Sequence, residues 1–480
     1  MLSRRYFKYF HQVFNIDRIG LPMHRISKLM HSKKTIVISW LAPVFLSLIL
    51  VLPASASENK GTSPAFSRIE DPVYITGEEL QPFLDQEISR LGLFVSKAGK
   101  LAPIPFQIDK KDKDGQYIQE MIKSGDKWQK NPRLPSPSKL EKNDEITFRA
   151  RDLGEKVSAD KWPTPSGLEI EITDPVNQAK AFAYLLAFPS SAPRSPADYI
   201  EFTPEPSLFR SDEITYGFTD PKHPALINYI AFGRDPKSPT LLDRFKMRMG
   251  ISIFFGKFKV EKNEEDIKVR LLAYTDGPLR VIILQEFAID IMSGIKSPWV
   301  KRVSISYPNR IEFPNDVYIP FRPGLVISEA HATATFDFSE NVSGSILYHP
   351  ALPAPLAVDG AMSPAELNAP PEYAPWCALA GKFGGFVETL KYDDRIAKAN
   401  IKKTFFYRDD SSYRDQYEYK PGSFGEMGMK ITGMEKLTGG TYQFTFALYG
   451  RKNFKPGDEK EFLQIESSPL EVKVHSENRK

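Results

Sequence analysis

Short segments in which apolar and polar residues alternate recur along most of this 480-residue sequence. In EITFRA (145–150), Ile146, Phe148 and Ala150 are apolar, and the residues between them are polar. A period of two places the apolar side chains of a strand on one face, whereas a helix needs a period near 3.6. LEIEI (168–172) repeats the pattern. We therefore predict a fold built from half-buried β-strands.

Composition and turn signals support the same fold class. Proline makes up 39 of the 480 residues and aromatic residues 12%, which is high for a helical protein. Asp-Gly-Pro at 276–278 separates two strand-like segments, 266–275 and 279–292, and predicts a turn between them. Long meandering strands of this kind favour an all-β, antiparallel β-sandwich or supersandwich with two β-rich regions and few helices.

The amino terminus predicts export. Residues 35–52 form an uncharged apolar run after two lysines (33–34), and a small-residue site ends at Ala56. This order is typical of a secretory signal peptide cleaved after Ala56. The run also has nearly the length of a transmembrane anchor, and the small-residue site favours cleavage. Met30 opens a signal of ordinary length, so residues 1–29 could be an upstream extension. The mature protein is predicted to be periplasmic or secreted, without a stable membrane span.

Removing the signal changes the charge balance. The mature chain keeps 56 basic and 59 acidic residues, so it has no basic excess and nucleic-acid binding is not predicted. Cys377 is the only cysteine, which excludes an internal disulfide. Its neighbours predict a core position for the thiol.

A Pro/Ser-rich stretch at 189–207 predicts a domain boundary, although a long surface loop would have the same composition. We expect an N-terminal β-rich domain over 57–205 and a larger β-sandwich domain over 206–475. The charged tail, 476–480, is predicted to fray.

The segment SEAHATATFDFSE (328–340) is the main candidate site. On a strand, its polar residues share one face and its apolar residues the other. Glu329 and His331 could act as an acid–base pair, with Asp337 as a ligand-binding residue on the same face. The alternative is the solvated polar face of a sandwich. The polar set is Glu329, His331, Thr333, Thr335 and Asp337.

Two tryptophans, Trp128 and Trp162, lie in polar, turn-rich contexts. An exposed indole there could stack on the apolar face of a sugar ring, and both are candidate ligand-binding residues. Packing at the edge of the core would explain them equally well.

Asp112 and Asp114 precede Gly115 in a charged turn and are the candidate calcium ligands. An EF-hand loop also requires a carboxylate at position one and a glutamate at position twelve. Lys110 and Met121 stand there, so an irregular calcium site or a solvated turn are the alternatives. No other cofactor is predicted.

Signatures of catalysis are missing from the sequence. No GxSxG, HExxH, P-loop or dinucleotide-binding motif occurs, and no two histidines have the spacing of metal ligands. The sequence therefore does not decide whether the protein is an enzyme.

Later segments give further structural expectations. Residues 325–340 and 344–350 look like two strands paired through a turn at 341–344. The Pro/Ala-rich stretch 350–375 predicts a loop or a short helix around SPAELN (363–368). The mixture of arginine, carboxylate and aromatic residues at 405–419 is typical of a carbohydrate- or peptide-facing loop, and a surface charge network would have the same composition.

Three segments carry a resemblance: PIPFQID (103–109), NDEITFRARDLG (143–154) and GPLR (277–280). They resemble a pattern in uncharacterised exported bacterial all-β proteins, which have been likened to the galactose mutarotase-like and polysaccharide-lyase supersandwich. The resemblance covers about half of the mature chain and implies that fold and a saccharide ligand. Mutarotase-like sites use paired histidines and a carboxylate, and no such pair stands here, so no catalytic residue is carried over.

These observations lead to two functional hypotheses. The first is an exported carbohydrate-binding or carbohydrate-processing protein with a saccharide ligand. The alternative is a noncatalytic periplasmic or envelope accessory or scaffold protein, associated with an outer-membrane or redox assembly. Neither hypothesis identifies a protein partner.

Overall fold

The computed structural model describes residues 66–480 except 221–225, 254–255, 293–294, 297–298, 320–321, 369–373, 415–416, 418–419 and 477–480. The chain divides into two units, Met1–Ser63 and Pro64–Lys480, and the described residues belong to the second. The predicted signal peptide, residues 1–56, lies outside the described residues, as does the predicted tail apart from Ser476. No described helix has both the length and the apolar character that a bilayer-spanning helix needs.

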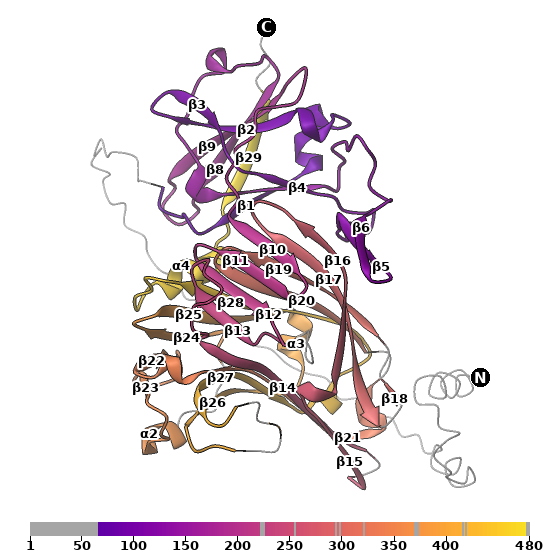
Figure 1. Ribbon diagram of the computed structural model, residues 1–480, viewed down its shortest axis with the longest axis vertical. Coiled ribbons are helices and arrows are strands. Elements are labelled where there is room, and N and C mark those ends of the chain that lie inside the picture. The colour runs from indigo at the N-terminus through magenta and orange to yellow at the C-terminus, as the bar shows by residue number, and fades with distance from the viewer. Residues whose placement is uncertain are drawn as a thin grey trace, which may run out of the picture. The chain divides into compact units, whose positions relative to one another are not determined.

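The described chain consists mainly of antiparallel strands, which confirms the predicted all-β class (Figure 1). EITFR forms β7, where Ile146 and Phe148 are almost fully buried. β7 is shorter than the predicted strand because a 3-10 turn begins at Ala150. It lies in a three-stranded sheet with the order β1 (Pro72–Thr76), β7 (Glu145–Arg149), β4 (Gln107–Asp109).

A five-stranded sheet shares its core with this three-stranded sheet. Val73 and Ile146 from one sheet and Leu93, Ile170 and Leu185 from the other belong to a single buried cluster. The strand order is β29 (Glu471–Ser476), β8 (Gly167–Thr173), β9 (Lys180–Ala187), β2 (Leu91–Lys97), β3 (Lys100–Pro103).

The last strand of the chain completes this early sheet. Figure 1 shows the yellow β29 beside the purple β8, and their ladder runs from Glu471 opposite Thr173 to Ser476 opposite Leu168. The predicted division at 205/206 stays a prediction.

The largest sheet has twelve strands, and β18 (Ile295–Lys296) is attached to it only through β17. The predicted turn at 276–278 joins β16 to β17, with Asp276 opposite Val281. The order of the other strands is β23 (Leu356–Val358), β22 (Ser345–Tyr348), β24 (Trp376–Gly381), β25 (Gly384–Tyr392), β28 (Gly440–Arg451), β20 (Arg310–Ile319), β19 (Val300–Tyr307), β17 (Val281–Met292), β16 (Ile267–Asp276), β5 (Met121–Ser124), β6 (Lys127–Lys130).

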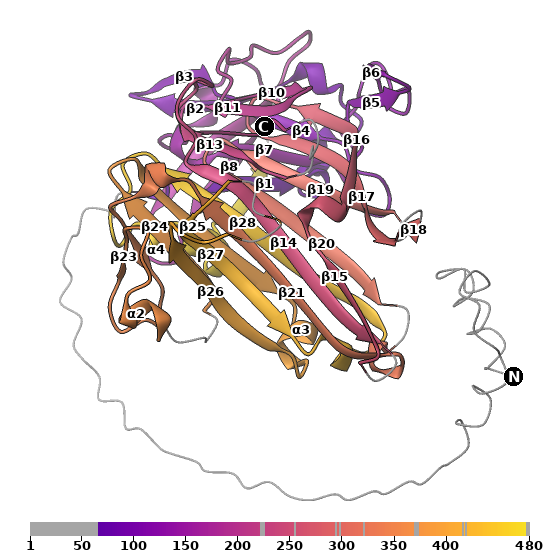
Figure 2. The same ribbon diagram turned by 60° about the horizontal axis from the view of Figure 1, so that its bottom comes forward.

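Two smaller sheets pack against the large one through one core. Phe336 on β21 and Met427 on β27 come from the first smaller sheet, and Phe209 on β11 comes from the second. They share one buried cluster with Phe386 on β25 of the large sheet. Figure 2 shows the long strands of the first sheet side by side. Its order is β15 (Phe258–Lys262), β14 (Leu242–Ile253), β21 (Ile327–Phe338), β27 (Ser423–Thr432), β26 (Lys402–Asp410). The order of the second is β10 (Ile200–Pro204), β11 (Ser207–Ser211), β12 (Ile214–Phe218), β13 (Tyr229–Phe232).

One predicted strand pair is wrong. β21 and β22 were expected to pair across residues 341–344, but they belong to different sheets. A 3-10 turn begins at Glu340, and Phe338 and Val342 on either side of it are both fully buried in the core between the sheets. The chain therefore crosses from one layer to the other instead of reversing within one sheet.

Helices are short and few among the described residues. The helix predicted in SPAELN is confirmed as α2, where the Ser363 hydroxyl accepts a hydrogen bond from the Glu366 amide. The α-helices are α2 (Pro364–Leu367), α3 (Asp394–Lys398) and α4 (Glu459–Ser467). The 3-10 helices are η4 (Gly77–Phe83), η5 (Ile88–Arg90), η6 (Ala150–Asp152), η7 (Ala159–Lys161), η8 (Glu264–Asp266), η9 (Pro323–Leu325), η10 (Glu340–Val342) and η11 (Met434–Lys436).

Candidate functional site

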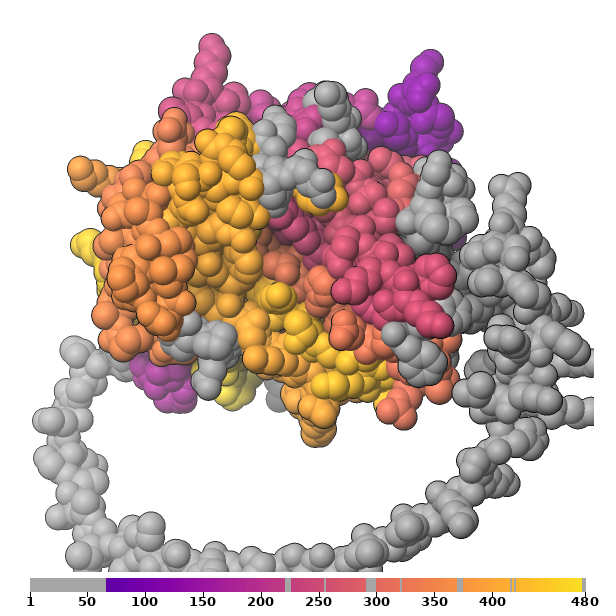
Figure 3. Space-filling model, turned by 90° about the horizontal axis from the view of Figure 1, so that it is seen from below, coloured from indigo at the N-terminus to yellow at the C-terminus, as the bar shows by residue number. Residues whose placement is uncertain are grey.

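A pocket of about 240 Å³ lies on the polar face of the β14–β21–β27 sheet. β21 forms its floor, with β14 and β15 on one side and β27 and β26 on the other. Figure 3 shows this hollow between the rose-coloured β14 and the orange-yellow β26 and β27. The side chains around it carry charges, hydroxyls and one phenyl ring: Lys246, Arg248, Glu261, His331, Thr333, Thr335, Phe406, Arg408, Glu426 and Lys430.

The alternation along β21 places its side chains as the sequence predicts. Phe336 and Phe338 are fully buried in the core, whereas His331, Thr333 and Thr335 line the pocket. Threonine is shorter than the lysine and arginine side chains on the flanking strand β14. The difference in length leaves the middle of the sheet hollow.

A buried ionic cluster forms the base of the pocket. The Lys246 ammonium lies 2.9 Å from Asp337 and 3.5 Å from Glu426, and each of these residues is no more than 3% exposed. The Thr335 hydroxyl donates to Glu426 at 2.7 Å. The Ser423 hydroxyl lies 3.0 Å from a carboxylate oxygen of both acids. Buried charges require such partners, so the base is held in one arrangement.

Arg408 forms one wall of the pocket. Its guanidinium lies 3.6 Å from the centre of the Tyr413 ring and 5.2 Å from that of Phe406. One guanidinium nitrogen is 3.7 Å from a Glu426 oxygen. Cation–π attraction to the two rings holds the guanidinium at the wall of the pocket.

His331 pairs with a carboxylate across a glycine. His331 and Glu261 flank Gly250 from the two neighbouring strands, and His331 Nε2 lies 3.5 Å from Glu261 Oε2. A Cβ on Gly250 would stand 2.4 Å from the imidazole and 2.5 Å from the carboxylate. The missing side chain therefore lets the two groups meet. An imidazole–carboxylate pair is the chemistry that general acid–base catalysis uses.

The three residues predicted on β21 have different surroundings. His331 lines the pocket, and Asp337 lies beneath it in an ion pair with Lys246. Glu329 is exposed and accepts a 3.5 Å hydrogen bond from the Ser252 hydroxyl. The structure thus brings His331 and Asp337 to one site, and the carboxylate close to His331 is that of Glu261.

Neither predicted tryptophan lies at this pocket. Trp162 is 6% exposed and packs against Tyr184 in a core cluster, so its ring presents no face to solvent. Trp128 lies on β6, half-buried, with its ring edge-on to Tyr274 at 4.9 Å.

Asp112 and Asp114 lie in a tight turn. Asp112 Oδ1 accepts hydrogen bonds from the backbone amides of Asp114 and Gln116, each at 2.9 Å. Gly115 takes a positive φ of 76°, which glycine adopts at little cost. Asp112 therefore uses a carboxylate oxygen to hold the turn.

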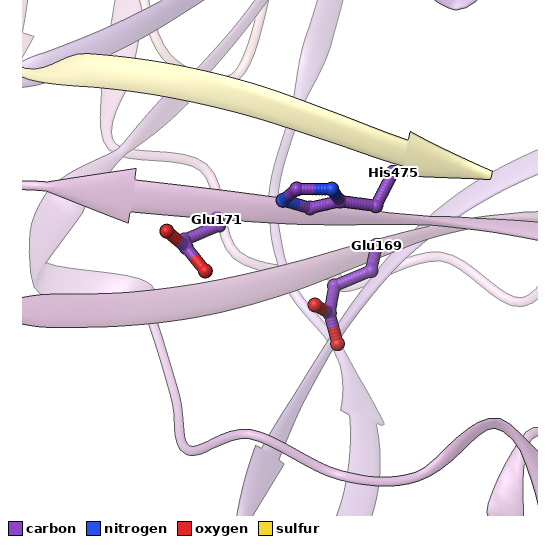
Figure 4. Close-up of side chains that lie close together, drawn as sticks. All are labelled: Glu169, Glu171 and His475. Atoms are coloured by element: carbon purple, nitrogen blue, oxygen red, sulfur yellow. The ribbon is translucent and has the colours of Figure 1, made fainter. Parts of the chain in front are cut away.

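Among the described residues, Glu169, Glu171 and His475 each place a potential ligand atom within 4.8 Å of the others. Figure 4 shows His475 from β29 beside the two glutamates of β8. Lys156 lies 2.8 Å from Glu169, and Lys180 lies 2.7 Å from Glu171. A cation at this place would compete with both ammonium groups.

A second, much smaller cavity of about 10 Å³ lies on the core side of the β24–β25 ladder. It is lined by His349, Cys377 and Glu388, and neither His349 Nε2 nor Glu388 Oε2 has a hydrogen-bond partner in the described chain. Burial lowers the pKa of His349 to about 4 and raises the pKa of the Cys377 thiol well above its usual value. The cavity has room for about one water molecule. The thiol is therefore in the predicted core position.

The three segments that carry the sequence resemblance meet at one buried arginine. Arg280 is 1% exposed, and its Nη2 lies 2.6 Å from Asp109 and 2.5 Å from Glu145. The Gln107 side chain accepts from the backbone amides of Leu279 and Arg280. This cluster ties β4 and β7 to the large sheet.

Several pocket residues that sequence reasoning missed follow the same period of two as β21. In KMRMG (246–250) and GEMGMK (425–430), the charged pocket residues alternate with methionines. FFYRD (405–409) shows no such alternation, and Glu261 lies on the short strand β15. The alternation was therefore visible for β14 and β27, but the sequence did not show that these strands adjoin β21.

No protein-family model and no curated protein matches the sequence. Among solved structures, a protein in glycosyl hydrolase family 38 from Enterococcus faecalis is similar over 84% of this chain and 45% of its own, with 8% identity and a TM-score of 0.43. An alpha-mannosidase from Enterococcus faecalis V583 is similar over 84% of this chain and 44% of its own, with 9% identity and a TM-score of 0.36. The chain spans less than half the length of each, and neither likeness bears on its function.

Proposed function

We propose that this protein binds a saccharide in the pocket of the β14–β21–β27 sheet. The observation that carries the proposal is the mixture of groups that line it: carboxylates, cations and hydroxyls around one aromatic ring. A sugar hydroxyl both donates and accepts hydrogen bonds, so it can bond to Glu426, Arg408 and Thr333 in turn. Phe406 offers an apolar face for the C–H side of the ring.

The size and rigidity of the pocket agree with such a ligand. At about 240 Å³ it is somewhat smaller than sites for drug-sized molecules, which begin at about 300 Å³. One sugar unit fits that scale. The buried cluster of Lys246, Asp337 and Glu426 holds the base before any ligand arrives, which lowers the entropic cost of binding.

Export remains part of the proposal. The predicted signal peptide would deliver the mature chain from residue 57 to the periplasm or medium, where saccharides are available. The intact mass of the exported protein tests this step, because a mass that retains residues 35–56 would contradict cleavage after Ala56.

Thermal unfolding of the purified protein with a panel of mono- and oligosaccharides tests binding. A ligand at about a hundred times its Kd adds about 2.7 kcal/mol to the free energy of unfolding and raises the unfolding midpoint measurably. Thr333→Val removes a pocket hydroxyl at nearly constant volume and should reduce the shift. The matched control is Thr441→Val, on the exposed face of β28, which should retain the full shift.

Other outcomes would point elsewhere. A shift with calcium alone would favour a cation site, for which Asp112 and Asp114 are the ligands predicted from the sequence. Absence of a shift with every sugar would overturn saccharide binding and favour the noncatalytic envelope accessory protein.

A further inference from the structure

Arg408 lines the pocket, and the contacts of its guanidinium in the described chain include no hydrogen bond. It has five N–H donors, and within the described residues no acceptor lies at hydrogen-bond distance from any of them. The Glu426 oxygen at 3.7 Å is beyond that distance. Tyr413 and Phe406 contact the guanidinium through their rings, which accept no conventional hydrogen bond, so its N–H donors are left to receive a ligand.

The charges around the pocket are unevenly compensated. On β14, Lys246 forms ion pairs with Asp337 and Glu426. Arg248 on the same strand lies 3.6 Å from the buried Glu264. On the opposite side, Lys430 is exposed on β27, next to the strand that carries Arg408. Arg408 shares Glu426 with Lys246, and the Lys430 ammonium has no ion pair among the described residues. The least compensated positive charge of the pocket is therefore on its β26–β27 side.

We infer that the saccharide carries an anionic oxygen group, a carboxylate or a sulfate or phosphate ester, bound edge-on by Arg408 with Lys430 beside it. This inference rests on the proposed function and adds the ligand class to it. A guanidinium edge matches two oxygens of such a group and forms two charge-assisted hydrogen bonds at once. A neutral sugar would offer only hydroxyl oxygens as acceptors for the N–H groups of Arg408.

Calorimetric titration of the purified protein with matched sugars tests the inference. The probes are D-glucuronate, D-galacturonate, glucose 6-sulfate and glucose 6-phosphate, each compared with D-glucose or D-galactose. At least one acidic probe should bind about tenfold more tightly than its neutral parent, which corresponds to about 1.4 kcal/mol. High salt should reduce this preference, because it screens the partly exposed cations.

Variants separate the guanidinium from a general charge effect. Arg408→Lys keeps the charge but loses the planar edge, so the preference for the acidic sugar should fall at least severalfold. Lys430→Gln, at an exposed position, should weaken the preference less and leave the fold intact. The control is Arg270→Gln, whose side chain is 60% exposed on β16 outside the pocket and which should change nothing.

The possible results distinguish this inference from the proposed function. Equal affinity for acidic and neutral sugars would overturn the inference while saccharide binding stands. No binding of any sugar would overturn both. Binding of inorganic sulfate or acetate as tight as that of the acidic sugars would show an anion site that ignores the sugar, and would likewise overturn the inference. An unchanged preference in both Arg408→Lys and Lys430→Gln would remove Arg408 and Lys430 as its cause.

Discussion

Glu388 is a carboxyl group that the fold keeps away from water. It is 4% exposed on β25, and its Oε2 has no hydrogen-bond partner in the described chain. Burial raises the pKa of Glu388 well above its usual value, and the adjacent Cys377 thiol only partly offsets this rise. A group of this kind costs stability when it must ionise.

Glu388→Gln should therefore stabilise the protein in a pH-dependent way. In the unfolded chain a glutamate ionises near pH 4.3, whereas the folded chain keeps the proton to higher pH. The wild type loses stability as the pH rises from about 4.3 towards the folded pKa. The variant lacks this loss, so its advantage should be near zero at pH 4 and grow by up to about 1.4 kcal/mol per pH unit. Denaturant unfolding from pH 4 to 8 measures it, and parallel curves for the two proteins would contradict the prediction.

The absence of a side chain at Gly250 allows the contact between His331 and Glu261. Gly250→Ala would push apart His331 and Glu261, whose side chains are 39% and 63% exposed and can move. We expect a change in stability within about 1 kcal/mol, since only mobile side chains must shift. Affinity for a pocket ligand should fall by about tenfold. Calorimetry and thermal unfolding of the same samples separate the two effects, and an unchanged affinity would show that the pair does not contribute to binding.

At the scale of elements, local patterns predicted strands well and pairing poorly. The period of two identified both faces of β21, because the signal lies within a dozen consecutive residues. The predicted pairing of β21 with β22, its neighbour in sequence, is wrong, because β14 and β27 flank β21. Strand pairing depends on burial in a shared core, and a short stretch of sequence does not contain that information.

The same limit explains the partial prediction of the site. His331 lines the pocket and Asp337 is buried next to it, and both were candidates because they share one strand. Arg408 and Glu426 belong to strands that meet β21 only through sheet topology. Trp162 was selected by its polar neighbours in sequence, yet it is buried by residues of the adjacent sheet. Side chains from distant segments thus determined each of these outcomes.

β29 offers a test of element-level cooperation. Ending the chain at Pro469 would remove the ladder to β8 and the partly buried Leu470, Val472 and Val474. We expect a loss of roughly 3 kcal/mol from the apolar contacts and new aggregation through the exposed edge of β8. Thermal unfolding and light scattering measure both. A chain ending at Ser476 is the control, and equal behaviour of the two truncations would show that β29 is dispensable.

At the scale of the whole molecule, buried ion pairs connect the sheets. Arg280 joins the large sheet to Asp109 on β4 and Glu145 on β7. Nearby, the Arg310 guanidinium lies 3.8 Å from the centre of the Tyr307 ring and donates to the Tyr74 hydroxyl at 3.0 Å. Such clusters fix how the sheets meet, because removing one partner leaves a buried charge without compensation.

Glu145 makes this connection dependent on pH. Burial raises its pKa, but Arg280 and Lys111 outweigh burial and lower the pKa to about 2. The stabilisation is complete above the unfolded pKa of about 4.3 and is lost as the pH falls through about 2. The difference between the two pKa values corresponds to about 3 kcal/mol at neutral pH.

Glu145→Gln keeps the shape of the side chain and removes its charge, so it isolates the contribution of that charge to stability. At pH 7 the free energy of unfolding of the variant should be about 3 kcal/mol lower than that of the wild type. This difference should shrink between pH 5 and pH 2 as Glu145 of the wild type gains a proton. The control is Glu286→Gln: Glu286 has the same 16% exposure, but its partner Arg270 is 60% exposed, so its loss should cost under about 1 kcal/mol. Denaturant unfolding across this pH range measures both. A deficit for Glu145→Gln that stays constant with pH would mean that packing, rather than the charge of Glu145, joins the sheets at Arg280.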